Sequence, residues 1–394
     1  MSTMAPGGNP SAIRHTRALR ICTAAGLFAG VALSYKLWLN SRLYPLTPAW
    51  PFPKPLPPPF DSVRLTALLI LLILIAVARR PRVFVGVFLL LAGWAACEDQ
   101  SRWQPWFYQY LFMLAAIGLA DGNRPEATLN TCRLIVASIY VWSGLEKMNP
   151  NFVHNTIPFL LTPLHLLALK KLMIAAPVLE CGAGCALLSR RFRRMAVVCA
   201  AGMHIFILLT IGPLGWNYNT VVWPWNIAMI ALLIILFWRA DDSPLDILWV
   251  RTPGPEFAFQ KVVLLLFGIA PALSFFNLWD TYLSFAFYTG NGDSASIYLS
   301  DATFDRLPDK LADYVYEYSP NVKELSIPDW SWGEFNAPHY PEDRIYRNVF
   351  RRVCELTGSP PDLKLVVRGK LALLHSGQER IYYCSPGASP MKSF

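Results

Sequence analysis

The polar residues that could do chemistry in this chain gather at the end of an apolar segment, in residues 140–152. Glu146 and Lys147 stand side by side there, within an apolar helical run. Because successive helix residues point about 100° apart, the two cannot face the same way. We therefore expect one of them to line a cavity while the other turns outward. A lysine taken out of water gives up its proton more readily and can act as a base, whereas a lysine at the membrane interface would only anchor the helix end.

A second polar group begins at His204, in the middle of another apolar run, and continues to Asn217 and Asn226. A histidine at this depth is either a catalytic group or a hydrogen-bonded core residue. The amides of Asn217 and Asn226 could stabilise a developing oxyanion, or they could cap and break the helices around Pro224. Together with Lys147, these three residues are the candidate catalytic residues.

Two other clusters are weaker candidates. Residues 121–124 have the composition of a turn, with Arg124 at the cytoplasmic end of a helix. Cys181 and Cys185 share one helix face, but two thiols are too few ligands for a metal ion. The sequence therefore predicts no metal site.

Membrane helices must position these side chains. The 394 residues are 54% hydrophobic and 15% charged, whereas soluble proteins average about 25% charged residues. The net charge of +9 comes largely from arginines in short groups between apolar runs, a pattern typical of cytoplasmic loops. No basic domain stands free of the membrane, so the sequence predicts no nucleic-acid partner; the predicted partner is the lipid bilayer.

The apolar runs predict an all-α polytopic membrane bundle of about nine transmembrane helices. The predicted spans are residues 19–39, 62–78, 83–97, 106–120, 133–147, 172–189, 195–212, 220–238 and 259–279. Residues 1–18 would then form a cytoplasmic N-terminal tail, residues 19–279 the membrane domain, and residues 280–394 a small α/β domain.

Loop charge gives this bundle a direction. With the N-terminus in the cytoplasm, the basic residues before the tail divide fifteen to eight in favour of the inside, as the positive-inside rule expects. Nine spans then place the C-terminal domain outside the cytoplasm, where Cys354 and Cys384 could pair. The predicted location is a bacterial inner membrane, with an endomembrane as the alternative.

The C-terminal domain is predicted to mix helices and strands. Strands are expected at residues 296–299, 363–367 and 380–383, and helices at 301–314 and 343–356. Its aromatic residues form a dense cluster that is either an exposed binding surface or the domain's core. The cluster contains Trp330, Trp332, Phe335, His339 and Tyr340.

Two of the polar runs, Trp103 with residues 121–124 and residues 140–152, resemble the membrane domain shared with the vitamin K-dependent γ-carboxylases, also called the horizontally transferred transmembrane (HTTM) domain. The resemblance extends over roughly residues 15–280 in topology, and its specific part is these two runs. It implies that Lys147 matches the lysine that deprotonates vitamin K hydroquinone. It also implies that His204 lies in a helix where the family has a histidine.

The chain departs from that family at two points. The carboxylases have a histidine shortly after the tryptophan that Trp103 matches, and the corresponding residue here is Trp106. They also have a far larger luminal portion, which holds the propeptide and the glutamate substrate. The resemblance therefore supports the fold and a polar intramembrane pocket better than it supports carboxylation of glutamate.

The predicted function is a membrane enzyme of this γ-carboxylase-like class, acting by carboxylation or by quinone-linked oxidation. Lys147 would be the base on a quinone-like or other lipid-soluble substrate, and the resemblance implies vitamin K or another quinone as cofactor. The alternative is a non-catalytic membrane anchor or assembly factor that binds a protein partner through its outer domain. A transporter is less favoured, because no inverted repeat is visible.

Overall fold

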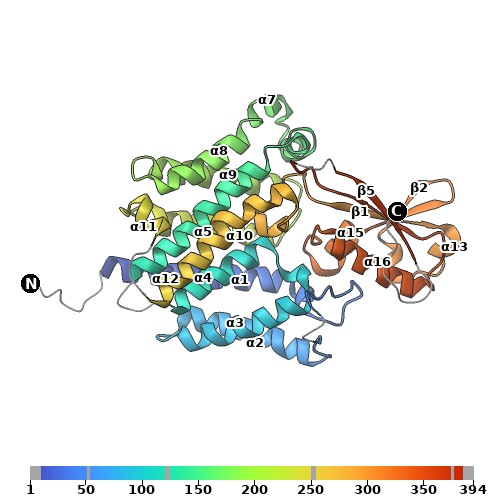
Figure 1. Cartoon of the computed structure of the whole chain (residues 1–394), viewed down its shortest axis with the longest axis horizontal. Helices are drawn as coiled ribbons and strands as arrows, with labels where there is room; N and C mark the ends of the chain where they lie inside the picture. Colours follow the sequence, from blue (N-terminus) through green and yellow to red (C-terminus); the bar gives the residue numbers. More distant parts are fainter. Residues whose placement is uncertain (1–9, 51–53, 120–124, 250–253, 374–376, 385–394) are drawn as a thin grey trace, which may run out of the picture.

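A bundle of long helices is joined end to end with a small sheet domain (Figure 1). The computed structural model describes residues 10–50, 54–119, 125–249, 254–373 and 377–384. The predicted turn at residues 121–124 lies outside the described residues. α1 begins at the end of the bundle away from the sheet domain, and its last turn reaches that domain, where the Asn336 amide donates to the Leu33 carbonyl at 3.0 Å.

Each predicted span overlaps a helical segment of the bundle. These segments are α1 (Pro10–Leu33), α2 (Phe60–Val77), α3 (Arg82–Glu98), α4 (Pro105–Leu119), α5 (Pro125–Glu146), α8 (Ala176–Leu188), α9 (Arg193–Ile211), α10 (Val222–Phe237), and α12 (Pro255–Val263) continued by η6 (Leu264–Ile269) and η7 (Ala270–Phe276). Short helices lie in the connections: α6 (Ile157–Leu161), α7 (Lys170–Met173) and α11 (Pro244–Leu248).

Four described helices are long and apolar enough to cross a membrane, which identifies a membrane protein. They are Ser11–Leu33, Phe60–Val77, Arg193–Ile211 and Pro255–Phe276. A fifth span results if Leu167–Met173 and Ala176–Leu188, which meet at a bend of 49°, are counted as one. Length and composition do not confirm nine spans, because α3, α4 and α10 have only 17, 15 and 16 residues, fewer than the roughly 20 that a bilayer core requires.

Buried ion pairs close the end of the bundle that faces the sheet domain. Arg64 pairs with Glu98 at 2.6 Å, and Arg42 pairs with Asp99 at 2.5 Å. Arg102 is fully buried between both carboxylates. These arginines look like ordinary loop charges in the sequence, yet in the fold they are interior residues that satisfy two buried acids.

The C-terminal domain is a five-stranded antiparallel sheet in the order β2-β3-β1-β4-β5, with helix α16 packed against β4. Its strands are β1 (Ser294–Ser300), β2 (Val315–Ser319), β3 (Val322–Ser326), β4 (Lys364–Arg368) and β5 (Glu379–Tyr383). Its helices are α13 (Asp301–Phe304), α14 (Asp309–Ala312), α15 (Ile327–Phe335) and α16 (Asp343–Thr357). The predictions of β1, β4, β5 and α16 are confirmed.

The predicted helix over residues 301–314 is wrong. Ser300 caps a helix there, accepting a hydrogen bond from the Thr303 amide, but α13 ends after a single turn. Pro308, which cannot donate a helical hydrogen bond, separates α13 from the equally short α14. Strands β2 and β3 were not predicted, because β2 is an edge strand with exposed residues on both faces and lacks the apolar alternation that signals a strand.

The aromatic cluster of this domain belongs to the core. Trp330, Phe335 and Tyr340 are each at most 1% exposed, while Trp332 and His339 are half-buried. Tyr44 of the bundle packs against the rings of Trp330 and Phe335, with centroids 4.9 and 5.0 Å apart. The interpretation of the cluster as an exposed binding surface is therefore wrong, and the aromatic rings instead fasten the sheet domain to the bundle.

A disulfide joins Cys354, near the end of α16, to Cys384, which follows β5. The two cysteines that the sequence singled out as able to pair therefore do so. The six other cysteines are free.

Candidate functional site

A cavity of about 340 Å³ lies inside the bundle, between α5, α8, α9, α10 and the segment that leads to the sheet domain. Most of its wall is apolar. Six polar side chains interrupt this wall, namely Tyr140, Lys147, Glu180, His204, Asn226 and Tyr288. Three of the four residues predicted as catalytic are therefore brought together, from α9, from α10 and from the end of α5.

Lys147 lies just past the end of α5, on the helix face that also carries Tyr140 and Ser143. Its Nζ donates to Ser143 Oγ at 2.5 Å and to Glu180 Oε1 at 3.0 Å. The Phe287 ring covers the ammonium group, with its centroid 5.3 Å from Nζ. Lys147 is the member of its pair that lines the cavity, as one of the two was expected to do. Glu146 does not turn outward, however, because it is 3% exposed.

Two glycines bring Glu180 to this lysine. A Cβ on Gly144 of α5 would lie 2.4 Å from the Cys181 backbone nitrogen, and a Cβ on Gly184 of α8 would lie 2.7 Å from the Val141 backbone nitrogen. Only glycine permits such an approach of two helix backbones. The side chain of Glu180, one turn before Gly184, therefore reaches Lys147 directly.

His204 is held in one orientation by a chain of hydrogen bonds. Asn226 donates its amide to the Val222 carbonyl at 2.7 Å, so its Oδ1 must accept from His204 Nδ1, also at 2.7 Å. This assignment leaves His204 Nε2 as an acceptor for the Tyr140 hydroxyl at 2.5 Å. Asn226 thus positions His204, which differs from the predicted role of donating its amide to an oxyanion.

Asn217 lies outside the cavity. It is exposed, and its φ of +49° places it in the left-handed region within the turn between α9 and α10. Its backbone N–H donates to the Gly212 carbonyl at 2.9 Å. The structure therefore gives Asn217 the turn role that was the alternative in its prediction.

Sequence reasoning missed Glu180 as a site residue. A signal existed, because an acid within the apolar helix α8 is costly unless it has a partner or a function. What the sequence could not supply was the partner, since Glu180 lies 33 residues after Lys147. In the described part of the chain, no three His, Cys, Asp or Glu side chains come close enough to hold a metal ion.

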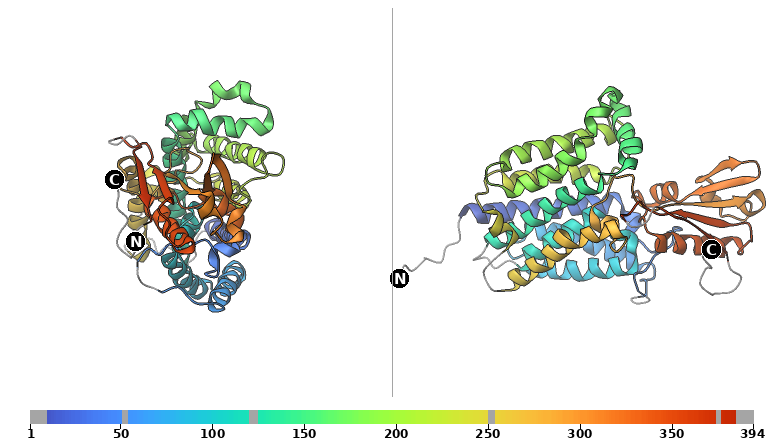
Figure 2. Two further views of the ribbon diagram at one scale, coloured as in Figure 1. Left: turned by 90° about the vertical axis from the view of Figure 1, so that its right-hand side faces the viewer. Right: turned by 45° about the horizontal axis from the view of Figure 1, so that its top comes forward.

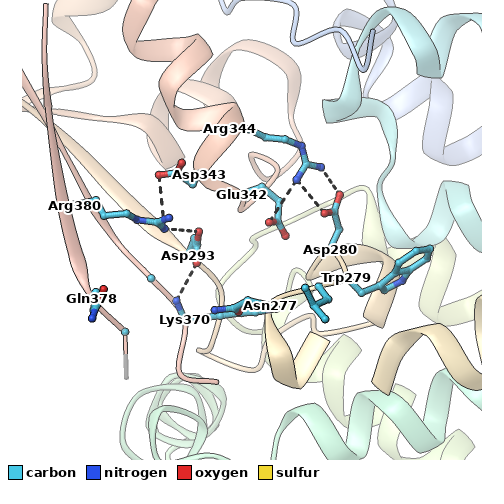
Figure 3. A pocket seen from close by; sticks show the side chains of 13 residues that line it. Asn277, Trp279, Asp280, Asp293, Glu342, Asp343, Arg344, Lys370, Gln378 and Arg380 are labelled. Carbon is cyan, nitrogen blue, oxygen red and sulfur yellow. Dashed lines mark hydrogen bonds and ion pairs between the residues drawn. The ribbon is translucent and has the colours of Figure 1, made fainter. Parts of the chain in front are cut away.

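A larger cavity of about 610 Å³ lies at the junction with the sheet domain, and most of its charged side chains are paired with one another (Figure 3). The exception is Lys370, whose ammonium group donates to Ser274 Oγ at 2.9 Å. Arg344 Nη1 contacts Asp280 at 3.0 Å and Glu342 at 3.7 Å. Burial, together with the nearby Asp280 carboxylate, raises the pKa of Glu342 to about 7. The ion pairs around this cavity hold the sheet domain against the bundle. Few of its charged groups are therefore left unpaired to bind a ligand.

Comparison with known proteins does not identify a family: no family model, no curated protein and no solved structure matches the chain. The resemblance to the HTTM domain therefore stays a prediction, carried by the residues quoted for it.

Proposed function

We propose that the chain spans the membrane nine times, with its N-terminus in the cytoplasm and its sheet domain outside. Nine long helical segments lie in the described part of the bundle, and an odd number of crossings would put the start of α1 and the sheet domain on opposite sides. α1 starts at the end of the bundle opposite the sheet domain (Figure 2). The disulfide between Cys354 and Cys384 fits an oxidising compartment, and loop charge favours the same direction.

We further propose that the cavity beside Lys147 binds a lipid-soluble, quinone-like molecule and that Lys147 is the base that deprotonates it. The observation that carries this proposal is a buried lysine with a buried acid and an oriented imidazole on the walls of one apolar cavity. Apolar pockets with a few oriented polar groups are the usual form of small-molecule sites. A buried charge of this kind, costly in a membrane, generally marks function.

Glu180 would accept the proton that Lys147 must lose before it can act as a base. Lys147 can act as a base only as a neutral amine. Transfer of one proton from Lys147 to Glu180, across their 3.0 Å contact, produces a neutral amine and a neutral acid without changing the total charge of the cavity. His204, which accepts from Tyr140, would fix that hydroxyl so that its oxygen remains free to accept a hydrogen bond from the bound ring.

The resemblance to the γ-carboxylase membrane domain supports the same assignment of Lys147. It does not extend to glutamate carboxylation, since Trp106 occupies the position of the family's histidine and does not line this cavity. The alternative of a non-catalytic anchor depended on an exposed aromatic surface, and three of its five rings, those of Trp330, Phe335 and Tyr340, are buried.

The test uses the full-length protein in lipid nanodiscs, mixed with menadiol, a reduced naphthoquinone. Deprotonation of the hydroquinone accelerates its oxidation by oxygen, in which the hydroquinone loses two electrons and two protons and oxygen becomes hydrogen peroxide. We expect the wild type to accelerate this oxidation and Lys147→Met to lose the acceleration. Lys171→Met, which removes an exposed lysine from α7, is the matched control and should behave as wild type.

Two results would overturn the proposal. One is equal oxidation rates with wild type and Lys147→Met. The other is the absence of saturable quinone binding, measured as quenching of tryptophan fluorescence that is lost when Trp225, which lines the cavity, is replaced by phenylalanine.

A further inference from the structure

A cavity of about 640 Å³ lies at the end of the bundle where α1 begins, away from the sheet domain (Figure 1). Three elements contribute arginines to its walls, namely α1 (Arg17 and Arg20), the turn after α2 (Arg79) and the start of α3 (Arg82). Arg20 joins these elements, because its Nη2 donates to the Ala76 carbonyl, in the last turn of α2, at 3.2 Å. The four guanidinium groups therefore gather around one space.

No aspartate or glutamate is among the described residues that line this cavity. A neighbouring cavity at the same end of the bundle, of about 390 Å³, differs in this respect. Its walls carry four acids next to its arginines, and Arg133 pairs there with Asp242 at 2.6 Å. The preference of basic residues for the cytoplasmic side accounts for arginines in both cavities, but not for the absence of acids from one of them. The described walls of the basic cavity therefore supply no counter-charge for its arginines.

Two of the four arginines are free to bind a ligand. Arg17 and Arg79 are exposed, and neither side chain forms an ion pair or a hydrogen bond within the described part of the chain. Arg17 also lies three residues before Arg20, on the same face of α1, so their charges repel each other. An anion between these groups would remove the repulsion, and guanidinium groups bind phosphate through paired, charge-assisted hydrogen bonds. The arrangement therefore favours a phosphate ligand.

Apolar side chains on the same walls indicate that this phosphate belongs to a lipid. Ile13 is 49% exposed and Val77 is 69% exposed, and both line the cavity. Val77 is the last residue of a helix that is long and apolar enough to cross a membrane. Arg79 and Arg82 therefore lie just beyond the hydrocarbon core, at the level of the lipid headgroups. A phospholipid at this position meets the arginines with its phosphate and the apolar side chains with its acyl chains.

We propose that this cavity binds the headgroup of an anionic phospholipid with two phosphates, such as diphosphatidylglycerol. Two phosphates compensate four guanidinium charges better than one does, and basic pockets between membrane helices are typical sites for such headgroups. The acyl chains extend past Ile13 and Val77 into the bilayer. The proposal is independent of the base assigned to Lys147, because no residue lines both cavities.

The experiment uses the full-length protein, freed of lipid in a nonionic detergent and titrated with diphosphatidylglycerol. Native mass spectrometry counts the bound lipid. Phosphatidylcholine is the comparator without net charge, and glycerol 3-phosphate, which has the phosphate without acyl chains, is added as a soluble competitor. We expect diphosphatidylglycerol to saturate the protein at a far lower mole fraction than phosphatidylcholine, without displacement by glycerol 3-phosphate.

The test variant combines Arg17→Gln with Arg79→Gln and removes two charges from the cavity. We expect its half-saturating fraction of diphosphatidylglycerol to rise about thirtyfold, the loss that two arginines near an anionic lipid surface produce. Arg191→Gln combined with Arg194→Gln is the matched control, because it removes the same charge from exposed arginines that do not line the cavity. These two lie beside Arg190, which shares the neighbouring cavity with Ser11 of α1, and therefore at the same end of the bundle. The control should bind the lipid as wild type does.

A second measurement needs no variant. Sodium chloride should weaken the binding of diphosphatidylglycerol to wild type, because salt screens exposed charges.

Saturable, salt-sensitive binding that is lost selectively in the Arg17 and Arg79 variant would support the proposal. Equal losses in the test variant and the control would overturn it, because the lipid would then respond to the overall charge at this end of the bundle. Equal affinity for phosphatidylcholine, or binding that salt does not change, would overturn it as well. Full displacement by glycerol 3-phosphate would assign the cavity to a soluble phosphate and overturn the assignment to a lipid.

Discussion

Replacement of Lys147 by methionine keeps an unbranched side chain, one heavy atom shorter, but removes its charge. Glu180 then remains buried, 8% exposed, without its cation. Removal of one partner of a buried ion pair typically costs about 3–5 kcal/mol, because the remaining charge is uncompensated. We expect a loss of this size in Lys147→Met and a similar loss in Glu180→Leu.

The double variant distinguishes the energy of the ion pair itself from the loss of stability that any substitution at this site would cause. Lys147→Met combined with Glu180→Leu buries two apolar side chains in place of the pair, an exchange that is often neutral or stabilising. We expect the free energy of unfolding of the double variant to lie within about 1 kcal/mol of wild type, which corresponds to a coupling energy of about 5 kcal/mol or more.

The assay is unfolding of the full-length protein in mixed micelles as the fraction of sodium dodecyl sulfate rises, followed by tryptophan fluorescence. The exposed pair of Arg352 and Glu355, at 3.1 Å, is the control and should show a coupling energy below about 1 kcal/mol. Additive losses in the Lys147 and Glu180 variants would refute the reasoning, since the two side chains would then not interact in the folded protein.

Three further predictions concern the scaffold. Gly144→Ala should destabilise the bundle by about 1–3 kcal/mol in the same micelle assay, because its Cβ would lie 2.4 Å from the backbone of α8, while Gly182→Ala, which has open space, should not. Loss of the disulfide through Cys354→Ser should lower the free energy of unfolding by about 3–4 kcal/mol in denaturant titrations, as expected for a sequence separation of 30, and reductant should abolish the difference from wild type. Since burial raises the folded-state pKa of Glu342 to about 7, the folded state holds a proton that the unfolded state lacks between about pH 4.5 and 7. The stability of wild type relative to Glu342→Gln should therefore fall by about 1–3 kcal/mol as pH rises through this window, and a difference independent of pH would contradict the shift.

Much of the secondary structure could be read from local patterns. Apolar runs located the helical segments of the bundle, and the proline and acids before Ile345 located the start of α16. Such patterns depend on neighbours within a few turns, so they survive without knowledge of the fold. These local patterns do not determine the number of membrane crossings, because α3, α4 and α10 are short for a bilayer.

The sequence by itself marked Lys147 and His204 as candidates for chemistry, since ionisable groups in apolar helices are costly wherever they end up. Only the tertiary structure decided their partners. Glu180 meets Lys147 because two glycine-mediated contacts draw α5 and α8 together, and Asn226 orients His204 from a different helix. Which helix faces meet is a property of packing across the whole bundle, and the local sequence around any one residue does not contain it.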